Sequence, residues 1–231
     1  MNYLYLWIDL FSFLGPFLLS FDKKVAFYKK WKALLPSIVI MMLLFIPWDV
    51  YFTVNGIWGF NEKYLCGLEI LHLPIEEWLF FIVVPYACVF IYECLRVYSK
   101  DFLRHVAKPI LLMLSIALVI VGMYKINNAY TAVNFLGAGV MILISFFTLK
   151  DKLGYSLFAY LVGLIPFLLV NGVLTGSMLD EPIVWYNDEE NLGIRIFTIP
   201  VEDTFYFLFF FLLVLVLYEK FKAYFLIQGN S

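Results

Sequence analysis

The chain has 231 residues, of which 64% are hydrophobic, 20% are aromatic and only 15% are charged, and its formal net charge is −2. This composition excludes an ordinary soluble domain, in which roughly a quarter of the residues are charged. No nucleic-acid partner is expected for such a chain.

Seven apolar stretches follow one another along the chain. They lie at residues 3–20, 33–54, 75–97, 109–124, 130–149, 155–175 and 201–218. The length of each stretch is close to what a helix needs to cross a bilayer core of roughly 30 Å, which is about 20 residues. Because that core holds no water for unpaired backbone groups, the stretches are predicted to be helices. We therefore expect an all-α integral membrane protein with seven transmembrane helices. The membrane expected for it is the cytoplasmic membrane of a bacterium, although the stretches themselves do not indicate the organism.

Basic residues are distributed unevenly among the connections. Thirteen of the 16 lysine and arginine residues follow the first, third, fifth or seventh stretch, and the other connections carry only Lys63, Lys125 and Arg195. Since basic residues are enriched on the cytoplasmic side, the N-terminus is predicted outside and the C-terminus inside. The first stretch lacks a preceding basic segment and a clear small-residue cleavage site, so it is expected to remain as a helix.

One segment of the chain occurs twice. Asn61, Gly67 and residues 74–77 (PIEE) recur 126 residues later as Asn187, Gly193 and residues 200–203 (PVED). A three-span unit that begins outside ends inside, so a second copy in the same orientation needs one extra crossing, which residues 109–124 supply. The predicted layout is 3+1+3, with parallel repeats at 1–98 and 127–231 and a linking fourth helix within 99–126. Parallel repeats place a site at the interface between the two halves.

Each copy brings two adjacent carboxyl groups to the start of a long apolar helix. They are Glu76 and Glu77 in the first copy and Glu202 and Asp203 in the second. Proline followed by acids is also ordinary chemistry for the start of a helix. The apolar flanks and the double occurrence favour a functional role, because ionisable groups in a membrane are costly unless they are used. Two close carboxyl groups in apolar surroundings can share a proton and provide a Brønsted acid within lipid.

Aromatic side chains follow the acids by one helical turn. Residues four apart share a helix face, so each of the four acids is expected to lie against a ring. Aromatic faces stabilise a nearby desolvated cation by about 2 kcal/mol or more. The candidates for this role are Trp78, Phe80, Phe81, Tyr206 and Phe207. Together with the acids they suit carbocation chemistry on an apolar, unsaturated substrate.

These motifs resemble the flavin-independent lycopene cyclases, a family found as two small separate chains or as one fused chain of repeated three-span units. Residues 74–81 (PIEEWLFF) fit the family pattern P-x-E-(E/D)-x-x-F-F, and the copy that begins at Pro200 departs only at Tyr206, where the pattern has phenylalanine. Further similar stretches are Trp48-Asp49, 56–61 (GIWGFN), Asn171-Gly172, 182–187 (PIVWYN) and 193–195 (GIR). The resemblance covers essentially the whole chain.

The resemblance implies an enzyme of carotenoid biosynthesis that closes the linear ends of lycopene, held within the membrane, to β-ionone rings. A carboxylic acid would protonate the terminal double bond, and a carboxylate would remove a proton after ring closure. The net redox change is zero and the chain has no dinucleotide fingerprint, so no cofactor is expected. Glu76 and Glu202 are expected to be the principal acid and base, with Glu77 and Asp203 as proton-sharing partners; which of them donates stays open.

Further polar residues are candidates for supporting roles. Asp49 and Asn171 correspond if the second copy carries a four-residue insertion. Asp49 would then tune or relay a proton, or simply lie at the membrane interface, and Asn171 would hydrogen-bond the opposite carboxylate.

The connections contribute three more candidates. Asn61 and Asn187 open the repeated segment. Arg195 either pairs with Glu202 or Asp203 or faces water. His72 and His105 are predicted on opposite sides of the membrane, so no metal site is expected.

Other classes of protein fit parts of the pattern. A transporter with parallel 3+1+3 repeats would use the acids for proton coupling, but the cytoplasmic halves of the stretches are almost wholly apolar and offer no polar path. A light-driven retinal protein is disfavoured, because residues 201–218 contain no lysine for a Schiff base. A carotenoid-binding protein without catalysis stays open, and an activity assay would separate it from a cyclase.

Overall fold

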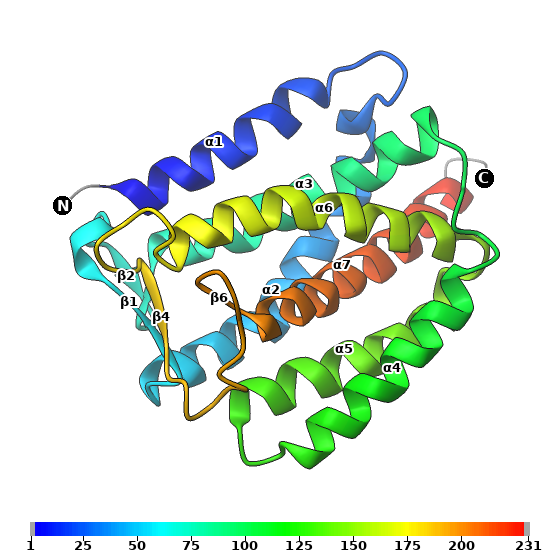
Figure 1. Cartoon of the computed structure of the whole chain (residues 1–231). Coiled ribbons are helices and arrows are strands. Elements are labelled where there is room, and N and C mark those ends of the chain that lie inside the picture. Colours follow the sequence, from blue (N-terminus) through cyan, green and yellow to red (C-terminus); the bar gives the residue numbers. More distant parts are fainter. Residues whose placement is uncertain (1–2, 229–231) are drawn as a thin grey trace.

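Seven α-helices make up most of residues 3–228, the part of the chain that the computed structural model describes (Figure 1). They are α1 (Leu4–Leu19), α2 (Trp31–Val54), α3 (Ile75–Tyr98), α4 (Ala107–Tyr124), α5 (Ala129–Thr148), α6 (Leu153–Leu174) and α7 (Val201–Gln228). Short 3-10 turns lie at Phe27–Lys30, Glu62–Tyr64 and Lys150–Lys152. The predicted all-α class is confirmed.

Six of the helices, α2 to α7, are long and apolar enough to cross a membrane, whereas α1 is a shorter apolar helix of 16 residues. At 1.5 Å per residue α1 is about 24 Å long, less than the bilayer core of roughly 30 Å. It ends at Leu19, and in the turn that follows the Asp22 carboxylate accepts the backbone N–H groups of Lys24 and Val25 at 3.0 and 2.9 Å. Six of the seven predicted spans therefore meet the length of a membrane helix.

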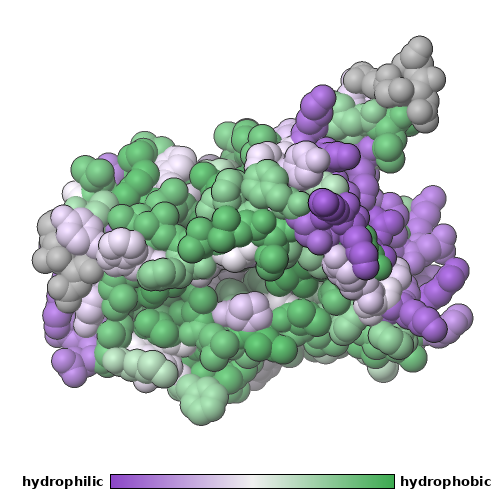
Figure 2. Space-filling model, turned by 90° about the horizontal axis from the view of Figure 1, so that it is seen from above, coloured by the Kyte–Doolittle hydropathy of each residue, from purple (hydrophilic) through white to green (hydrophobic). Residues whose placement is uncertain are grey.

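The helices run back and forth between two ends of the bundle (Figure 1). The connections rich in lysine and arginine lie at the end where the C-terminal helix finishes, and hydrophilic residues gather at that end in Figure 2. The acid pairs begin α3 and α7 at the opposite end. Both pairs thus lie on the same side of the apolar bundle.

Two short hairpins lead into the helices that carry the acids. β2 (Glu69–Ile70) pairs with β3 (Leu73–Pro74) immediately before α3, and β5 (Arg195–Ile196) pairs with β6 (Ile199–Pro200) immediately before α7. Each hairpin is closed by a backbone hydrogen bond of 2.9 Å, from Ile75 N to Leu68 O and from Val201 N to Ile194 O. The two copies of the segment therefore fold in the same way.

A third ladder joins the two copies to each other. β1 (Trp58–Phe60) runs antiparallel to β4 (Val184–Tyr186), and Gly59 pairs with Trp185, its equivalent 126 residues later. The Trp185 ring lies so close to Gly59 that a Cβ on Gly59 would approach it to 2.3 Å. Glycine is therefore required at the centre of this ladder.

Helix packing also crosses between the copies. α1 packs against α3, and α5 packs against α7, but α2 also packs against α7 and α6 against α3. α4 lies against α5 and α6. The starts of α3 and α7 are consequently each enclosed by helices of both halves of the chain.

Candidate active site

The first acid of each pair holds the preceding loop. Glu76 accepts the backbone N–H of Cys66, and Glu202 accepts that of Leu192, both at 2.7 Å and both through Oε1. Glu202 also accepts the hydroxyl of Thr131 at 2.6 Å. Both carboxyl groups are fully buried. They join each loop to the first turn of the helix that follows it.

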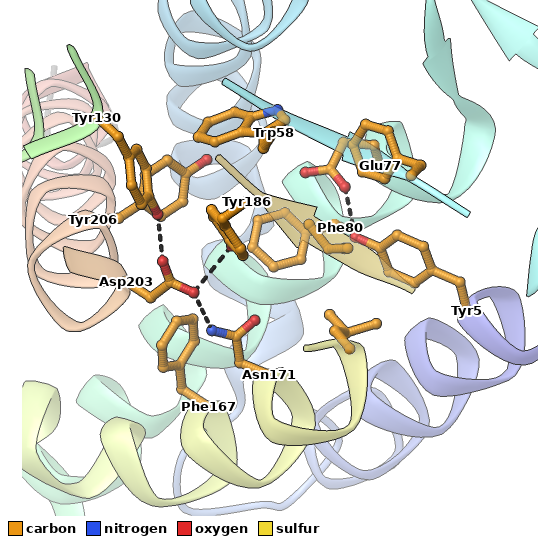
Figure 3. A pocket seen from close by; sticks show the side chains of 13 residues that line it. Tyr5, Trp58, Glu77, Phe80, Tyr130, Phe167, Asn171, Tyr186, Asp203 and Tyr206 are labelled. Atoms are coloured by element: carbon orange, nitrogen blue, oxygen red, sulfur yellow. Dashed lines mark hydrogen bonds between the residues drawn. The ribbon is translucent and has the colours of Figure 1, made fainter. Parts of the chain in front are cut away.

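The second acids of the two pairs, Glu77 and Asp203, line the same cavity, which has a volume of about 50 Å³. Adjacent helix positions point about 100° apart, which explains why neighbouring carboxyl groups have different surroundings. In Figure 3 Glu77 and Asp203 lie on opposite sides of the cavity, with rings between and around them. The lining consists of Tyr5, Trp58, Phe60, Glu77, Phe80, Tyr130, Phe167, Asn171, Leu174, Val184, Tyr186, Asp203 and Tyr206.

Asp203 is surrounded by hydrogen-bond donors. Asn171 Nδ2 donates to its Oδ2 at 2.6 Å, the Tyr186 hydroxyl donates to the same oxygen at 3.0 Å, and the Tyr130 hydroxyl donates to Oδ1 (Figure 3). Hydrogen bonds to a charged carboxylate favour the charged form. Asn171 therefore donates to the carboxylate of its own copy, rather than to the opposite one expected from the sequence.

Glu77 has a different environment. Within residues 3–228 it accepts a single hydrogen bond, from the Tyr5 hydroxyl at 2.6 Å (Figure 3). Two further buried carboxyl groups, those of Asp9 on α1 and Asp49 on α2, interact with it electrostatically. Asp49 is itself held by the indole N–H of Trp58, which donates to Asp49 Oδ1 at 2.9 Å. Asp49 is buried within the protein.

The aromatic residues named from the sequence divide into three groups. Phe80 and Tyr206 line the cavity. Phe81 is fully buried against Phe210 in the core, and Phe207 stacks on Phe167 with 4.4 Å between ring centroids. The indole of Trp78 lies elsewhere and donates to Ile70 O in the preceding hairpin at 3.1 Å.

An apolar groove adjoins the acid cavity. It has a volume of about 410 Å³, and its walls come from α1, α3 and α6, with Phe207 of α7. The groove and the acid cavity share the lining residues Phe80, Phe167, Asn171 and Leu174. The surface in Figure 2 is largely hydrophobic and is hollowed near its middle. An elongated apolar molecule in the groove would have one end beside the carboxyl groups.

The remaining predicted site residues hold the connections. The side chains of Asn61 and Asn187 accept the backbone N–H two residues on, each at 3.1 Å. Arg195 pairs with Asp188 at 2.5 Å and donates to Thr198 O at 2.7 Å. The sequence allows two environments for Arg195, a pair with Glu202 or Asp203 or exposure to water. Within residues 3–228 Arg195 forms no pair with either acid, and its side chain is partly exposed.

The structure adds cavity residues that the motifs did not identify. Tyr5 and Tyr130, at equivalent places in α1 and α5, donate to Glu77 and Asp203 respectively. A weak signal for them exists, because the spacing Tyr5-(three)-Asp9 recurs 125 residues later as Tyr130-(three)-Asn134. From the sequence alone, which does not show that they contact the acids, tyrosines at the start of apolar helices are ordinary interfacial residues.

The long apolar helices define a membrane protein that encloses two buried acids beside an apolar groove. The family model described as lycopene cyclase matches residues 2–95 and 127–221, once over each copy of the repeat. The chain therefore belongs to the lycopene cyclase family.

One curated relative is similar over a short region. It is a bifunctional lycopene cyclase/phytoene synthase from Aspergillus niger, 36% identical over 67 residues. The match covers 29% of this chain and 11% of that protein, so the chain spans a small part of the relative's length. No solved structure matches the chain.

Proposed function

We propose that this protein is a lycopene β-cyclase of carotenoid biosynthesis, which closes the linear ends of lycopene to give γ- or β-carotene. The observation that carries this proposal is the cavity between the two copies, which combines Glu77 and Asp203 with aromatic walls and adjoins an apolar groove. Membership of the lycopene cyclase family supports the same substrate and reaction.

The proposed reaction is an isomerisation driven by proton transfer. A carboxylic acid protonates the terminal double bond, and the internal double bond attacks the resulting tertiary cation to close the ring. A carboxylate then removes the neighbouring proton, so no atom is gained or lost and no electron is transferred. General acid–base catalysis and electrostatic stabilisation of the cation would supply the rate, and the reaction requires no cofactor.

The two cavities suggest how the substrate lies. The polyene would occupy the groove between α1, α3 and α6, and its terminal double bond would reach the acids. The rings of Phe80, Trp58 and Tyr206 line the acid cavity, where the cation forms. Because the groove and the acid cavity share lining residues, each end of the substrate would enter the same cavity and be cyclised in turn.

Among the four acids, Glu77 and Asp203 are the proposed acid–base pair. They line the cavity, whereas Glu76 and Glu202 accept backbone N–H groups of the preceding loops. This differs from the expectation that Glu76 and Glu202 react with substrate. The physical reason is the rotation of about 100° between adjacent helix positions, which motif spacing alone does not orient.

The proposal includes a membrane topology. Residues 1–98 and 127–231 would form parallel repeats joined by α4 within 99–126, in the cytoplasmic membrane of a bacterium. The N-terminus would be outside and the C-terminus inside. The equivalent hairpins before α3 and α7 support the repeats, and the basic connections at one end support the orientation.

Pigment analysis of lycopene-producing cells that express the chain tests this function. Cells with the native protein should accumulate γ- or β-carotene, and cells with Glu77→Gln should retain lycopene. Glu69→Gln, at an exposed position in β2, is the matched control and should behave like the native protein. Unchanged lycopene with well-expressed native protein would refute the enzyme, and lycopene that co-purifies with it would instead indicate a carotenoid-binding protein.

A further inference from the structure

The two copies of the repeat differ in their buried polar residues. The first copy has Asp9 and Asp49, and at the equivalent positions the second copy has Asn134 and Asn171. All four side chains are buried. An aspartic acid can hold or release a proton, whereas an asparagine of the same shape cannot. The two sides of the cavity therefore differ in their capacity to store protons.

On the side of the first copy, the buried carboxyl groups of Asp9 and Asp49 both interact electrostatically with that of Glu77, and Glu76 precedes Glu77 on the same helix turn. Asp9, Asp49 and Glu77 are exposed by only 3, 1 and 8%. One carboxyl oxygen of Asp9 and one of Asp49 have no hydrogen-bond partner among the described residues. No lysine, arginine or histidine within residues 3–228 forms an ion pair with any of the three. Close, buried carboxyl groups without a counter-ion cannot all be ionised, so this cluster retains protons.

The side of the second copy stabilises a negative charge instead. Asp203 accepts from Tyr130, Tyr186 and Asn171. Asn134, at the position of Asp9, adds no charge and donates to Tyr130 O at 2.9 Å. A carboxylate that accepts two or three hydrogen bonds is favoured in its ionised form. Asp203 is therefore suited to accept a proton from a substrate cation.

We propose that Glu77 donates the proton that starts cyclisation, that Asp203 accepts the proton that ends it, and that Asp9 and Asp49 are positioning residues that keep Glu77 protonated. This inference rests on the proposed cyclase function. In each turnover Glu77 loses a proton to the less substituted carbon of the terminal double bond, which leaves the tertiary cation on the other carbon, and Asp203 gains a proton from the new ring. The proton returns from Asp203 to Glu77 before the next turnover, so the balance closes without any other reactant.

Deuterium exchange separates donor from acceptor. In heavy water, lycopene incubated with Asp203→Asn should acquire deuterium without ring closure to product, because Glu77 still protonates the double bond and takes the proton back. Lycopene incubated with Glu77→Gln should acquire none. Deuterium in the substrate recovered from Glu77→Gln, or none in that from Asp203→Asn, would overturn the assignment.

An experiment on the native protein separates failure of the cyclase function from failure of the donor and acceptor assignment. If native protein forms no rings in heavy water, the cyclase function itself fails. If it forms rings that carry deuterium, the function holds and only the variants decide between donor and acceptor. The two failures are thus observed in different samples.

The role of Asp9 is tested by Asp9→Asn, which introduces the residue found at the equivalent position of the second copy. Turnover should fall by about tenfold or more, up to the about 10²–10⁴ that loss of the general acid itself would cost, and KM should not change. The infrared carbonyl band of protonated Glu77 can be identified because Glu77→Gln lacks it. In Asp9→Asn this band should weaken. Asp9→Glu should restore both, and Asp22→Asn, in an exposed turn, is the control. If Asp9→Asn were as active as the native protein while Asp9→Glu was not, the shape of the side chain and not its proton would matter. Asp9 would then have a structural role only.

Discussion

At the scale of single residues, the adjacent acids of each pair act on different parts of the structure. The carboxyl groups of Glu76 and Glu202 bond backbone N–H groups of the loops, and those of Glu77 and Asp203 line the cavity. An amide side chain can accept the same backbone hydrogen bond as a carboxylate, but it has no proton to transfer to a double bond. Substitution by glutamine therefore separates the two kinds of role.

Glu76→Gln and Glu77→Gln should differ sharply in activity. In Glu76→Gln the amide oxygen of the new side chain can still accept the N–H of Cys66, so most activity should survive. Loss of a general acid at position 77 should cost about 10²–10⁴ in rate. Initial rates of lycopene cyclisation by purified, folded variants measure the difference. The assignment of roles would be contradicted if Glu76→Gln lost more activity than Glu77→Gln.

Tyr130→Phe should weaken the acceptor side of the cavity. It removes one of three hydrogen bonds to Asp203, and a hydrogen bond to a charged group contributes about 1.5–3 kcal/mol. A decrease in kcat of roughly 10–100-fold is expected, since about 1.4 kcal/mol corresponds to a factor of ten. Tyr124→Phe is the matched control, because Tyr124 is 82% exposed. An unchanged kcat for Tyr130→Phe would exclude its hydroxyl from the site.

At the scale of helices, α3 and α7 are joined again at the end opposite the acids. The Tyr92 hydroxyl of α3 donates to Glu219 of α7, and the Tyr218 hydroxyl of α7 donates to Glu93 of α3, each at 2.8 Å. The two tyrosines and the two glutamates are each 126 residues apart. The basic residues that pair with the two glutamates are Lys30, Arg96, Lys152 and Lys222.

Glu93→Gln should destabilise this connection. The carboxylate pairs with Lys30 and Lys222, both at 2.5 Å, and its removal would leave two ammonium groups close together. Breaking a buried pair costs about 3–5 kcal/mol, but the partly exposed lysines are screened, so a loss of roughly 1–3 kcal/mol is expected. Thermal unfolding in detergent measures it, with the exposed Glu189→Gln as control. A native Tm for Glu93→Gln would show that the pairs contribute little.

Gly59→Ala should disturb the ladder between the two copies. The new Cβ would meet the Trp185 ring at 2.3 Å, and overpacking of this kind costs about 1–3 kcal/mol. The Tm should fall, together with activity, because Trp58 and Phe60 on either side of Gly59 line the acid cavity. Gly15→Ala is the control, since nothing lies within 4 Å of a Cβ at Gly15. Equal Tm values for the two variants would show that the ladder adapts freely.

At the scale of the whole molecule, the topology places both acid pairs at one end of the bundle. Cysteines introduced at Lys29 and Asp188 should react with a membrane-impermeant reagent from opposite sides, with Lys29→Cys labelled from the cytoplasm. The starting protein would carry Cys66→Ala, Cys88→Ala and Cys94→Ala, so that only the new thiol reacts. Labelling of both positions from one side would contradict the proposed arrangement and the common location of the acids.

Several features of the molecule could be predicted from the sequence because they depend on short stretches of chain. A continuous apolar run in a membrane forms a helix whichever helices pack against it. α3 and α7 accordingly begin at the predicted residues, Ile75 and Val201. The predicted bounds of α1, 3–20, also agree with the observed helix Leu4–Leu19 and its two caps, and α1 is the shortest of the seven helices. The equivalence of Asp49 and Asn171 rested on an inferred four-residue insertion. The structure brings both of them close to the second acid of their own copy.

By itself the sequence determined the all-α class, the duplication and the position of an acid pair at the start of two apolar helices. These are properties of local order and hydropathy. Only the tertiary structure decided that Glu77 and Asp203, rather than Glu76 and Glu202, line the cavity, and that Tyr5 and Tyr130 donate to them. The residues in each of these hydrogen bonds are 72 or 73 positions apart. Their meeting depends on how α1 and α5 pack against α3 and α7, which no local pattern of residues specifies.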